Sequence, residues 1–332
     1  MSEPFRDLPD LPGELEALLR QVPPGRVTTY GVLAESLGNR IAARWVGHFM
    51  LHHEHTAECP CHRVVRAGGQ IGEYIAGGPP AKAKRLAAEG VDVRHGTVDL
   101  ARFEFDRFRS DRPLEQLGRV QEDLVSRVAL RSRRRVPRLV AGVDVSYPNP
   151  DRGVAAYALV EAESGELVWS TTIRRRVVFP YISTYLAFRE LPILLDLVDE
   201  VRGAGRLAEL VLVDGNGILH QRRAGIASHL GVLASLATIG VTKKLLCGSV
   251  ALEGLEPEES RPVVLDDRVI GLAIRPAAGS RRPIFISPGH CTNLAFAECA
   301  VRRLLRGRRL PEPLYWADRL SRQAGRTGAG RA

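Results

Sequence analysis

The chain has 332 residues, of which 45% are hydrophobic and 26% charged, a balance typical of a globular protein with room for two domains. Its formal net charge of +9 favours a polyanionic partner, because clustered cations release counterions when they bind phosphates. No apolar stretch is long enough to cross a bilayer and the chain start lacks the layout of a signal peptide, so we expect a cytoplasmic protein without a membrane partner. Five cysteines, an odd number in a long chain, indicate reduced thiols rather than a disulfide framework.

Short helices are expected in the first fifty residues. The pattern predicts an amphipathic helix over residues 11–22, a turn and a helix over 27–38, and another helix over 41–51. Two short helices joined by a glycine-containing turn are typical of a helix-turn-helix, whose second helix would lie in a DNA groove. This pattern and the net charge both favour nucleic acid, although arginine supplies nearly all of the charge and its abundance also follows genome base composition.

The next feature is a Pro-Cys-His-Arg-Val sequence at residues 60–64, followed by Gly-Glu-Tyr at residues 72–74 and by two glycines at 77 and 78. From about Leu15 to Val93 the chain resembles the catalytic domain of O6-alkylguanine-DNA alkyltransferases, whose signature is Pro-Cys-His-Arg-Val. Such an enzyme needs a cysteine with thiolate character, and an imidazole held by a carboxylate can draw the proton off the thiol. The resemblance therefore implies the transfer of an alkyl group from guanine to a cysteine.

The resemblance to alkyltransferases also assigns roles to individual residues. Cys61 would accept the alkyl group, His62 would act as its base through a water, and Glu89 would orient that histidine. The damaged nucleotide is expected to be flipped out, because a base cannot be dealkylated inside the stack. Tyr30 would contact the phosphate of the flipped nucleotide, and Arg44 would take the place of the extruded base in the stack. Tyr74 would line the pocket for the alkylguanine.

The chain departs from the alkyltransferase pattern at two places. Where that family has an Asn-Pro hinge before the cysteine, this chain has His53-Glu54, and one extra residue stands near Ile75. These departures concern the helix-to-loop geometry and the range of accepted alkyl groups rather than the nucleophile. A relative with its cysteine replaced would only bind the lesion, whereas this chain keeps Cys61.

Zinc binding is a competing interpretation of the stretch around the acceptor cysteine, because it is rich in imidazole and thiol ligands. The spacing of these ligands fits no common pair-and-pair zinc pattern, and Cys61 is accounted for by the alkyltransferase signature. The candidates are His48, His52, His53, His55, Cys59, Cys61 and His62.

Residues 96–112 lose periodicity and are expected to form a linker. They would separate a first domain, residues 1–95, from a second domain, residues 113–322, with a disordered tail at 323–332. In the second domain we expect strands first and then alternating helices and strands, which predicts a mixed sheet covered by helices. Its first elements are a long amphipathic helix over 113–131, strands over 139–147, 154–160 and 166–178, and a helix from about Ser183.

Two apolar strands of the second domain carry carboxylates. Asp144 lies within the β-branched run 139–147, and Asp214 ends the run 210–214 just before a glycine-rich turn. An ionised aspartate in a strand covered on both faces needs a partner or a cation, because its isolated burial costs several kcal/mol. Each aspartate alone is also compatible with capping a turn or a helix. The pair together predicts a divalent-cation site at one edge of the sheet.

A string of motifs then follows in order along this domain, and the chain from about Leu114 to Leu320 resembles endonuclease V, a repair nuclease with a ribonuclease H-like fold that acts on deaminated adenine. The motifs are Phe-Pro-Tyr-Ile at 179–182, Phe-Arg-Glu at 188–190, Val-Asp-Gly-Asn-Gly at 213–217, His-Gln-Arg at 220–222, Ser-His-Leu-Gly at 228–231, Ile-Gly-Val-Thr-Lys at 239–243 and Ser-Pro-Gly-His at 287–290.

The resemblance to endonuclease V implies a metal site and a set of DNA contacts. Its metal ligands would be Asp144, Glu190 and Asp214. Lys243 would offset charge on the phosphate and His290 would lie near the attacking water or the leaving group. In the helix that carries it, His229 is expected to be a hydrogen-bonded core histidine. On the DNA side, Tyr181 would belong to the strand-separating wedge, which departs from the family at Ser183-Thr184, and His220 would contact the base or backbone.

We therefore predict a multidomain α+β and α/β protein, with a winged-helix-like alkyltransferase domain followed by a ribonuclease H-like nuclease domain. Its predicted function is bifunctional DNA repair: suicide transfer of alkyl groups to Cys61 and cleavage of the strand 3' to deoxyinosine. The expected cofactor is Mg2+, with Mn2+ as a substitute, and the expected partner is double-stranded DNA carrying either lesion, without an obligate protein partner. The alternatives are a damage-binding module that targets a nuclease, and a nuclease for inosine-containing RNA.

Overall fold

The computed structural model describes residues 8–131, 133–276, 280 and 282–328, and the chain divides into two compact units. The first unit comprises the described residues up to Arg119 together with Phe179–Tyr185, and the second comprises Val120–Val178 and the described residues from Leu186 onward. The division falls inside helix α6 (Pro113–Val125). Each unit has its own secondary structure and its own buried core.

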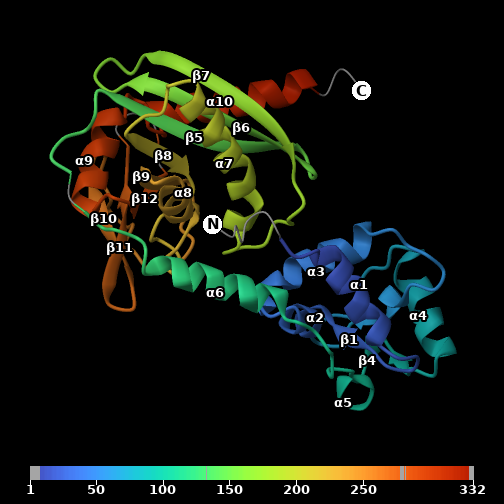
Figure 1. Cartoon of the computed structure of the whole chain (residues 1–332). Coiled ribbons are helices and arrows are strands. Elements are labelled where there is room, and N and C mark those ends of the chain that lie inside the picture. The colour runs from blue at the N-terminus through green and yellow to red at the C-terminus, as the bar shows by residue number, and fades with distance from the viewer. Residues whose placement is uncertain (1–7, 132, 277–279, 281, 329–332) are drawn as a thin grey trace. The chain divides into compact units, whose positions relative to one another are not determined.

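The first unit is built mainly from short helices, with two small pairs of strands (Figure 1). β1 pairs with β2 in parallel, and β3 pairs with β4 in antiparallel fashion. Its elements are α1 (Leu11–Gln21), β1 (Thr28–Thr29), α2 (Tyr30–Ser36), the 3-10 helix η1 (Arg40–Ala42), α3 (Ala43–His52), the 3-10 helix η2 (Pro60–Arg63), β2 (Val64–Val65), α4 (Gly78–Ala88), β3 (Val93–Arg94), β4 (Thr97–Val98) and α5 (Leu100–Phe103).

Side-chain caps and helical spacing explain why these short helices form. The carboxylate of Asp10 accepts a hydrogen bond from Gly13 N, and the hydroxyl of Thr29 accepts one from Val32 N, so each satisfies a backbone donor at a helix start. The buried leucines of α1 recur at helical spacing, at positions 11, 15, 18 and 19. The helices predicted over 11–22, 27–38 and 41–51 thus correspond to α1, α2 and η1 with α3.

The segment expected as a linker, residues 96–112, contains β4 and α5 in the structure. Backbone hydrogen bonds join it to the start of the helical unit, because Val27 N donates to Phe103 O and Phe105 N donates to Val27 O. Phe103 is buried in the same small core as Val27. The absence of periodicity in this segment therefore reflects short, irregular packing elements.

The second unit is a mixed eight-stranded sheet with helices on both faces, as its sequence pattern predicts (Figure 1). The strand order is β10-β11-β12-β9-β8-β5-β6-β7, with β8 parallel to both β5 and β9 and the other neighbours antiparallel. The strands are β5 (Leu139–Asn149), β6 (Arg152–Glu161), β7 (Leu167–Arg176), β8 (Leu210–Asp214), β9 (Ala237–Thr242), β10 (Ser260–Leu265), β11 (Arg268–Ile274) and β12 (Ile284–His290), and the helices are α7 (Leu186–Gly203), α8 (Ile226–Ala234), α9 (Leu294–Leu304) and α10 (Glu312–Gly328).

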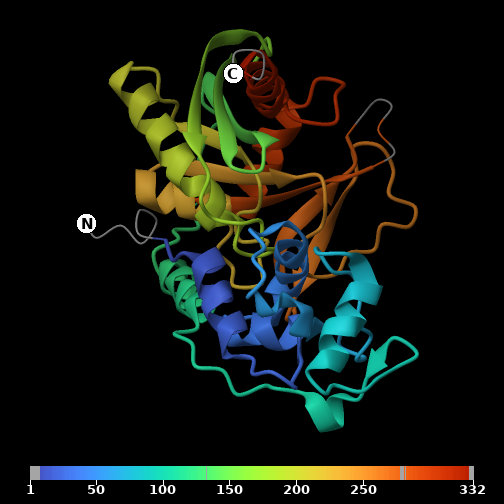
Figure 2. The same cartoon turned by 90° about the vertical axis from the view of Figure 1, so that its right-hand side faces the viewer.

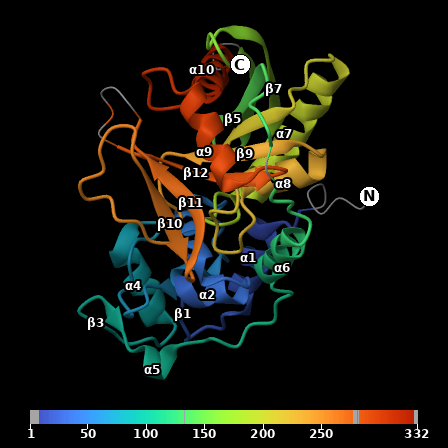
Figure 3. The ribbon, with the colours of Figure 1, turned by 90° about the vertical axis from the view of Figure 1, so that its left-hand side faces the viewer.

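Two helices cover each face of this sheet. Helices α9 and α10 pack on the face that carries Val140, Leu212 and Ile239, and all of them belong to one apolar core. Helix α10 (red) lies against the green strands β5 and β6, and α7 and α8 pack together on the other side (Figure 2). At the far edge, β10 and β11 extend the sheet beyond β12 (Figure 3). The carboxyl end of β8 therefore lies next to the middle of the parallel strand β5, on the face that α10 covers.

Some element boundaries differ from those expected. The helix expected from Ser183 begins at Leu186, because Thr184 has a φ of +66° and this left-handed conformation cannot continue into a right-handed helix. The helix expected to reach residue 131 ends at Val125, and α10 extends through residues 323–328, which were expected in the tail. Among the described residues, no helix is both long enough and apolar enough to cross a membrane.

Candidate active sites

Cys61 lies in η2 and is 3% exposed. The pairing of Val64 and Val65 with Thr28 and Thr29 fixes the chain directly after this turn. The pKa of Cys61 is raised, first by its hydrogen bond with the Cys59 thiol and then by burial. The same hydrogen bond lowers the pKa of Cys59. In the absence of another group, Cys61 is therefore the protonated member of the pair and needs a base before it can act as a nucleophile.

His62 and Glu89 form the arrangement that such a base requires. Their side chains meet with 2.8 Å between His62 Nε2 and Glu89 Oε1, and Arg63 donates two hydrogen bonds to the same carboxylate, at 2.9 and 2.7 Å. Partial burial would raise the pKa of Glu89, but the hydrogen bonds from Arg63 and His62 hold it at about 2. Burial lowers the pKa of His62, although Glu89 opposes this effect. A neutral His62 that donates through Nε2 keeps a lone pair on Nδ1, and this buried atom has no hydrogen-bond partner among the described residues.

The three residues expected to contact DNA in the first unit lie on α2, on α3 and in the loop before α4. Tyr30 begins α2 and is half-buried, Arg44 is exposed on the first turn of α3, and Tyr74 is buried with its ring edge-on to His62 at 6.4 Å between centroids. The Tyr74 hydroxyl accepts a hydrogen bond from Arg85 at 2.8 Å. Tyr74 is therefore part of the Cys61 surroundings.

Lys82 is a residue of this site that the sequence reading missed. It is 1% exposed, and its ammonium donates hydrogen bonds to the carbonyl oxygens of Val64, Ile71 and Glu73. Burial lowers its pKa to about 8. By binding these carbonyls, Lys82 ties β2 to the loop that ends in Tyr74. A lysine in an alanine-rich helix gives no sequence signal for this role, because such a residue is normally on the surface.

The second group of site residues lies within the large sheet, where β8 ends beside the middle of β5. Asp144 on β5 and Asp214 at the end of β8 are brought together because Val143 pairs with Val213 in the parallel register. Asp318 on α10 joins them, and a carboxylate oxygen of each lies within 4.8 Å of the others. Asp318 was not predicted, because the motifs of this domain end before α10 and only the packing of that helix on β5 and β6 brings it to the strands.

Hydrogen bonds and ion pairs fix these three carboxylates. Ser321 donates to Asp144 Oδ2 at 2.7 Å, and Lys243 Nζ lies 3.1 Å from both Asp214 Oδ2 and Asp318 Oδ1. Burial, followed by the charge of Asp214, raises the pKa of Asp144. Burial would lower the pKa of Lys243, but the charges of Asp214 and Asp318 raise it. Lys243 thus remains cationic and compensates part of the negative charge of the group.

Gly142 explains how α10 comes so close to β5. A Cβ atom at this position would lie 2.3 Å from both the carbonyl carbon and the oxygen of Pro313 at the start of α10. The bare backbone at Gly142 therefore allows the helix to pack directly on the strand. This close packing brings Asp318 and Ser321 to Asp144.

Glu190 and His290, also predicted for this site, lie outside the group of three carboxylates. Glu190 is buried on α7 and accepts a hydrogen bond from the Tyr147 hydroxyl at 3.0 Å. Burial and then the charge of Asp144 raise its pKa well above the usual value. His290 ends β12, and its Nδ1 accepts a hydrogen bond from Ala129 N at 3.2 Å, so a neutral ring carries its proton on Nε2. Burial, then the charges of Arg131 and Arg127, lower its pKa and favour that neutral form.

The remaining predicted residues differ in exposure. Tyr181 is 63% exposed, whereas His220 is buried and its Nδ1 accepts a hydrogen bond from Arg222 N at 3.2 Å. His229 is fully buried and its Nδ1 lies 2.8 Å from Gly225 O, which confirms the expected core histidine.

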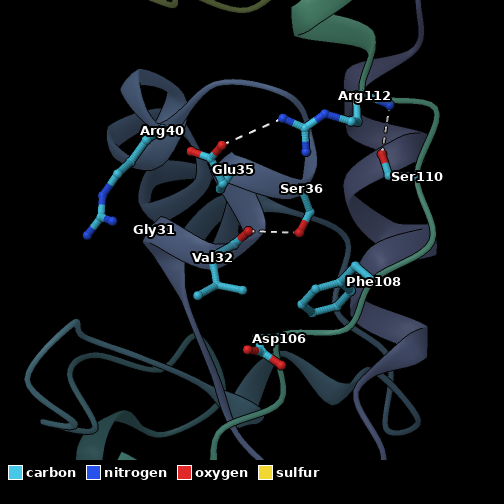
Figure 4. A pocket seen from close by; sticks show the side chains of 9 residues that line it. All are labelled: Gly31, Val32, Glu35, Ser36, Arg40, Asp106, Phe108, Ser110 and Arg112. Carbon is cyan, nitrogen blue, oxygen red and sulfur yellow. Dashed lines mark hydrogen bonds and ion pairs between the residues drawn. The ribbon is translucent and has the colours of Figure 1, made fainter.

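A surface pocket of about 310 Å³ lies in the first unit between α2 and residues 106–112 (Figure 4). Glu35 and Arg112 form an ion pair at 3.6 Å there, and the Ser36 hydroxyl donates to the carbonyl of Val32. None of the predicted site residues lines this pocket. The two candidate sites are therefore recognised by their chemistry rather than by the size of a cavity.

Comparisons with known proteins match the two halves separately. The model of the endonuclease V family matches residues 122–319, and that of the 6-O-methylguanine DNA methyltransferase DNA-binding domain matches residues 14–91. A bifunctional methyltransferase/endonuclease of Picrophilus torridus is 36% identical over 241 residues, which cover 73% of this chain and 77% of that protein. A protein of the same description from Thermoplasma volcanium is 35% identical over 71% of each chain.

Solved structures agree with these matches. The crystal structure of human ENDOV is similar with a TM-score of 0.61 and 35% identity, covering 65% of this chain and all of that one. That of Ciona intestinalis endonuclease V, in complex with a 24mer DNA containing an inosine followed by a ribo-adenosine, has a TM-score of 0.59 and 29% identity and covers 66% and 99%. These matches and the mixed sheet confirm the predicted multidomain fold. The chain belongs to the endonuclease V family and joins that nuclease to an alkyltransferase domain, which makes it an enzyme of both the methyltransferase and the endonuclease class.

Proposed function

We propose that the first unit transfers an alkyl group from O6-alkylguanine in double-stranded DNA to Cys61. The observation that carries this proposal is the hydrogen-bonded pair of buried His62 and half-buried Glu89, next to a buried cysteine in η2. We further propose that the second unit cleaves the DNA strand 3' to deoxyinosine with Mg2+. That proposal rests on the carboxylates of Asp144, Asp214 and Asp318, which converge where β8 ends beside β5.

In the proposed transfer, the thiol proton of Cys61 passes through a water to Nδ1 of His62, while Glu89 holds Nε2–H and stabilises the positive charge on the ring. The Cys61 sulfur then forms a bond to the alkyl carbon as the bond from that carbon to O6 breaks. The electron pair stays on the guanine, which takes up a proton. The product on the protein is a thioether without a leaving route, so each chain acts once.

The flipped guanine would be held by residues that already surround Cys61. Tyr74 is oriented by Arg85 and by the loop that Lys82 ties down, which makes it suited to contact the base. Arg44 is exposed and can occupy the vacated place in the stack, and Tyr30 would lie against the phosphate.

The donors of the second site suit a hard divalent cation. Carboxylate oxygens are the ligands that Mg2+ and Mn2+ prefer, and three of them converge here. We propose that Asp144 and Asp214 hold the metal with Asp318, and that Glu190 contributes from α7. When bound, Mg2+ would stabilise negative charge on the scissile phosphate and lower the pKa of a bound water.

The other side chains of this site would act on the DNA directly. Lys243 carries a positive charge next to Asp214 and can move toward the phosphate when a cation takes over that charge compensation. His290 would donate its Nε2 proton near the leaving oxygen. Outside this site, in the stretch 179–185 that belongs to the first unit, Tyr181 would fill the gap beside the extruded base, and its 63% exposure leaves the ring accessible. His220 would contact the backbone of the DNA.

The transfer is tested by incubating the full chain with a duplex that carries O6-methylguanine and measuring the mass of the peptide that contains Cys61. We expect a gain of one methyl group per molecule. Binding of the duplex without any gain in mass would show a module that only recognises the lesion.

The cleavage is tested with a deoxyinosine duplex, with and without Mg2+, followed by mapping of the product ends. Asp214→Ala should abolish cleavage and leave DNA binding intact or tighter, because it removes both a metal ligand and a charge that repels phosphate. If Asp214→Ala cleaves as fast as the wild type, Asp214 is not a metal ligand.

The Ciona relative was crystallised with a strand in which a ribo-adenosine follows the inosine, which favours a second candidate, a nuclease that prefers inosine next to ribonucleotides or in RNA. Three matched substrates distinguish the candidates: a DNA duplex, the same duplex with one ribo-adenosine after the inosine, and an RNA strand. Equal cleavage of the first two would support a DNA repair nuclease.

A further inference from the structure

Four side chains with metal-binding atoms converge around the acceptor cysteine. One ligand atom from each of His53, His55, Cys59 and Cys61 lies within 4.8 Å of all the others. His53 Nε2 is 3.2 Å from Cys59 Sγ, and His55 Nδ1 is 3.4 Å from Cys61 Sγ. Bond lengths of about 2.0–2.3 Å in a tetrahedral zinc site place neighbouring ligand atoms roughly 3.3–3.8 Å apart. The group is therefore close to the size of such a site before any rearrangement.

Neighbouring groups orient the imidazoles toward the centre of the group. His53 Nδ1 lies 3.1 Å from Phe49 O, and when this nitrogen donates to the carbonyl, the lone pair of Nε2 faces Cys59. The His53 ring also stacks on the ring of Phe49, with 5.2 Å between centroids. For His55, Nδ1 faces Cys61 while Nε2 lies 3.5 Å from the Tyr74 hydroxyl. Histidines that bind metals are usually held in this way, with the second nitrogen bonded to a carbonyl or another polar group.

We propose that His53, His55, Cys59 and Cys61 bind one Zn2+ ion. Two thiolates and two imidazoles are ligands that Zn2+ accepts in tetrahedral geometry, whereas Mg2+ prefers oxygen. The ligands come as two pairs, each with one residue between its members and three residues between the pairs, a spacing unlike the common zinc patterns. Local packing brings them together, because His53 ends α3 while Cys61 lies in η2.

The proposal also explains the departure from the alkyltransferase hinge. The residue that stands in place of the family's asparagine, His53, is 9% exposed and supplies a ligand. His52, one position earlier on α3, is exposed, and its ring stacks on His48 with 4.0 Å between centroids. Neither of these two histidines belongs to the group of four. His48 and His52 are thus exposed to solvent, whereas His53 and His55 lie against the two cysteines.

The site has a consequence that rests on the proposed alkyl transfer. Alkylation of the metal-free chain replaces the Cys61 thiol by a neutral thioether, which cannot become a thiolate and is a much weaker zinc ligand. The metal would then be held by three strong ligands instead of four, and its affinity would fall. The affinity of the chain for Zn2+ would thus depend on whether the Cys61 sulfur carries an alkyl group.

The metal site is tested first on the unalkylated full chain with Co2+ as the probe, in a non-chelating reductant. We expect one bound Co2+ per chain to show the visible absorption of tetrahedral cobalt and thiolate-to-cobalt charge transfer, and one equivalent of Zn2+ to remove this absorption, whatever Co2+ the nuclease site also binds. The carboxylates of the nuclease site cannot give the charge-transfer band.

Four variants localise the band. His53→Asn, which restores the residue that alkyltransferases carry and so is expected to fold, and Cys59→Ser should each weaken binding by more than about 100-fold, because loss of a ligand exceeds the roughly 10–100-fold cost of losing its outer partner. His52→Ala and Cys299→Ser are matched controls at exposed positions outside the group and should leave the spectrum unchanged. Absence of the charge-transfer band in the wild type, or its persistence in both His53→Asn and Cys59→Ser, would overturn the proposal.

The second arm compares the chain before and after reaction with O6-methylguanine DNA. Protein with methylated Cys61 should bind Zn2+ at least tenfold more weakly and show the cobalt spectrum of one thiolate. An unchanged two-thiolate spectrum in a chain whose Cys61 carries the methyl group would contradict the proposal. If no methyl group is taken up, the proposed transfer fails, while the variants of the first arm still decide the metal site.

Discussion

Glu89 is the residue that sets the protonation of the first site. Its carboxylate accepts hydrogen bonds from His62 and Arg63, and these bonds hold its pKa at about 2. The carboxylate therefore remains ionised at neutral pH. It fixes the tautomer of His62 that leaves Nδ1 free to take a proton.

Replacing Glu89 by glutamine should slow alkyl transfer at pH 7 by about tenfold or more, because general-base catalysis contributes about 10²–10⁴ and this residue orients and stabilises the base. Single-turnover kinetics measure the rate constant, and DNA affinity should be unchanged. Glu14→Gln on α1 is the control. If Glu89→Gln lowers DNA affinity by about tenfold but leaves the rate constant of alkyl transfer unchanged, Glu89 has a structural role only.

The same variant should change the dependence of stability on pH. The pKa of Glu89 is lower in the folded chain than its usual 4.5, so its contribution is present above about pH 4.5 and is lost as the pH falls toward 2. Wild-type stability should therefore decline more steeply across this window than that of Glu89→Gln. Parallel curves in acid denaturation experiments would contradict the role given to the Arg63 and His62 bonds.

Asp318 belongs to the carboxylate group in the structure but was not predicted from the sequence. Asp318→Asn keeps the shape of the side chain but removes one charge from the group with Asp144 and Asp214. We expect cleavage at deoxyinosine to fall by about 100-fold and the Mg2+ concentration needed for half-maximal activity to rise. Asp199→Asn, on the exposed side of α7, is the control. Unchanged cleavage and Mg2+ dependence would show that Asp318 is not a ligand.

At the scale of elements, the close contact between β5 and α10 supports the second site. Gly142→Ala would place a methyl group 2.3 Å from the Pro313 carbonyl, and overpacking of this kind costs about 1–3 kcal/mol. In a unit of this size we expect the melting temperature to fall by roughly 2–10 °C. Cleavage should fall as well, because α10 carries Asp318. Gly203→Ala, where an added Cβ meets no atom within 4 Å, should be neutral or stabilising.

A neutral effect of Gly142→Ala on both melting and cleavage would mean that α10 can move away without consequence. The role assigned to the helix in positioning Asp318 would then be wrong.

The helices and strands also explain which parts of the fold and of the sites could be predicted from the sequence. Apolar, β-branched runs predict β5 and β8, and their parallel pairing makes Asp144 and Asp214 neighbours. No local pattern could place Asp318, because an amphipathic helix indicates its apolar face but not the sheet on which that face packs. Lys82 was missed because its three carbonyl partners lie in the preceding strand and loop, which no pattern of its own helix indicates. Ligand spacing likewise argued against zinc around Cys61, whereas the fold brings the four side chains together.

At the scale of the whole molecule, the two units carry chemistries that share no functional group. Thiol transfer needs a proton acceptor and a flipped base, whereas phosphodiester cleavage needs stabilisation of charge on a phosphate. The family models match 14–91 and 122–319, with no residue in common. Each activity should therefore survive loss of the other in the full chain.

The most direct test uses the wild type, Cys61→Ala and Asp214→Ala with duplexes that carry O6-methylguanine or deoxyinosine, each with Mg2+ or with a chelator. We predict methyl transfer by the wild type and Asp214→Ala under both conditions, because His62 and Glu89 supply the proton route without a metal. Cleavage at deoxyinosine should occur with Mg2+ alone, in the wild type and in Cys61→Ala. Loss of cleavage in a folded Cys61→Ala, or loss of methyl transfer in a folded Asp214→Ala, would contradict the account of two independent active sites.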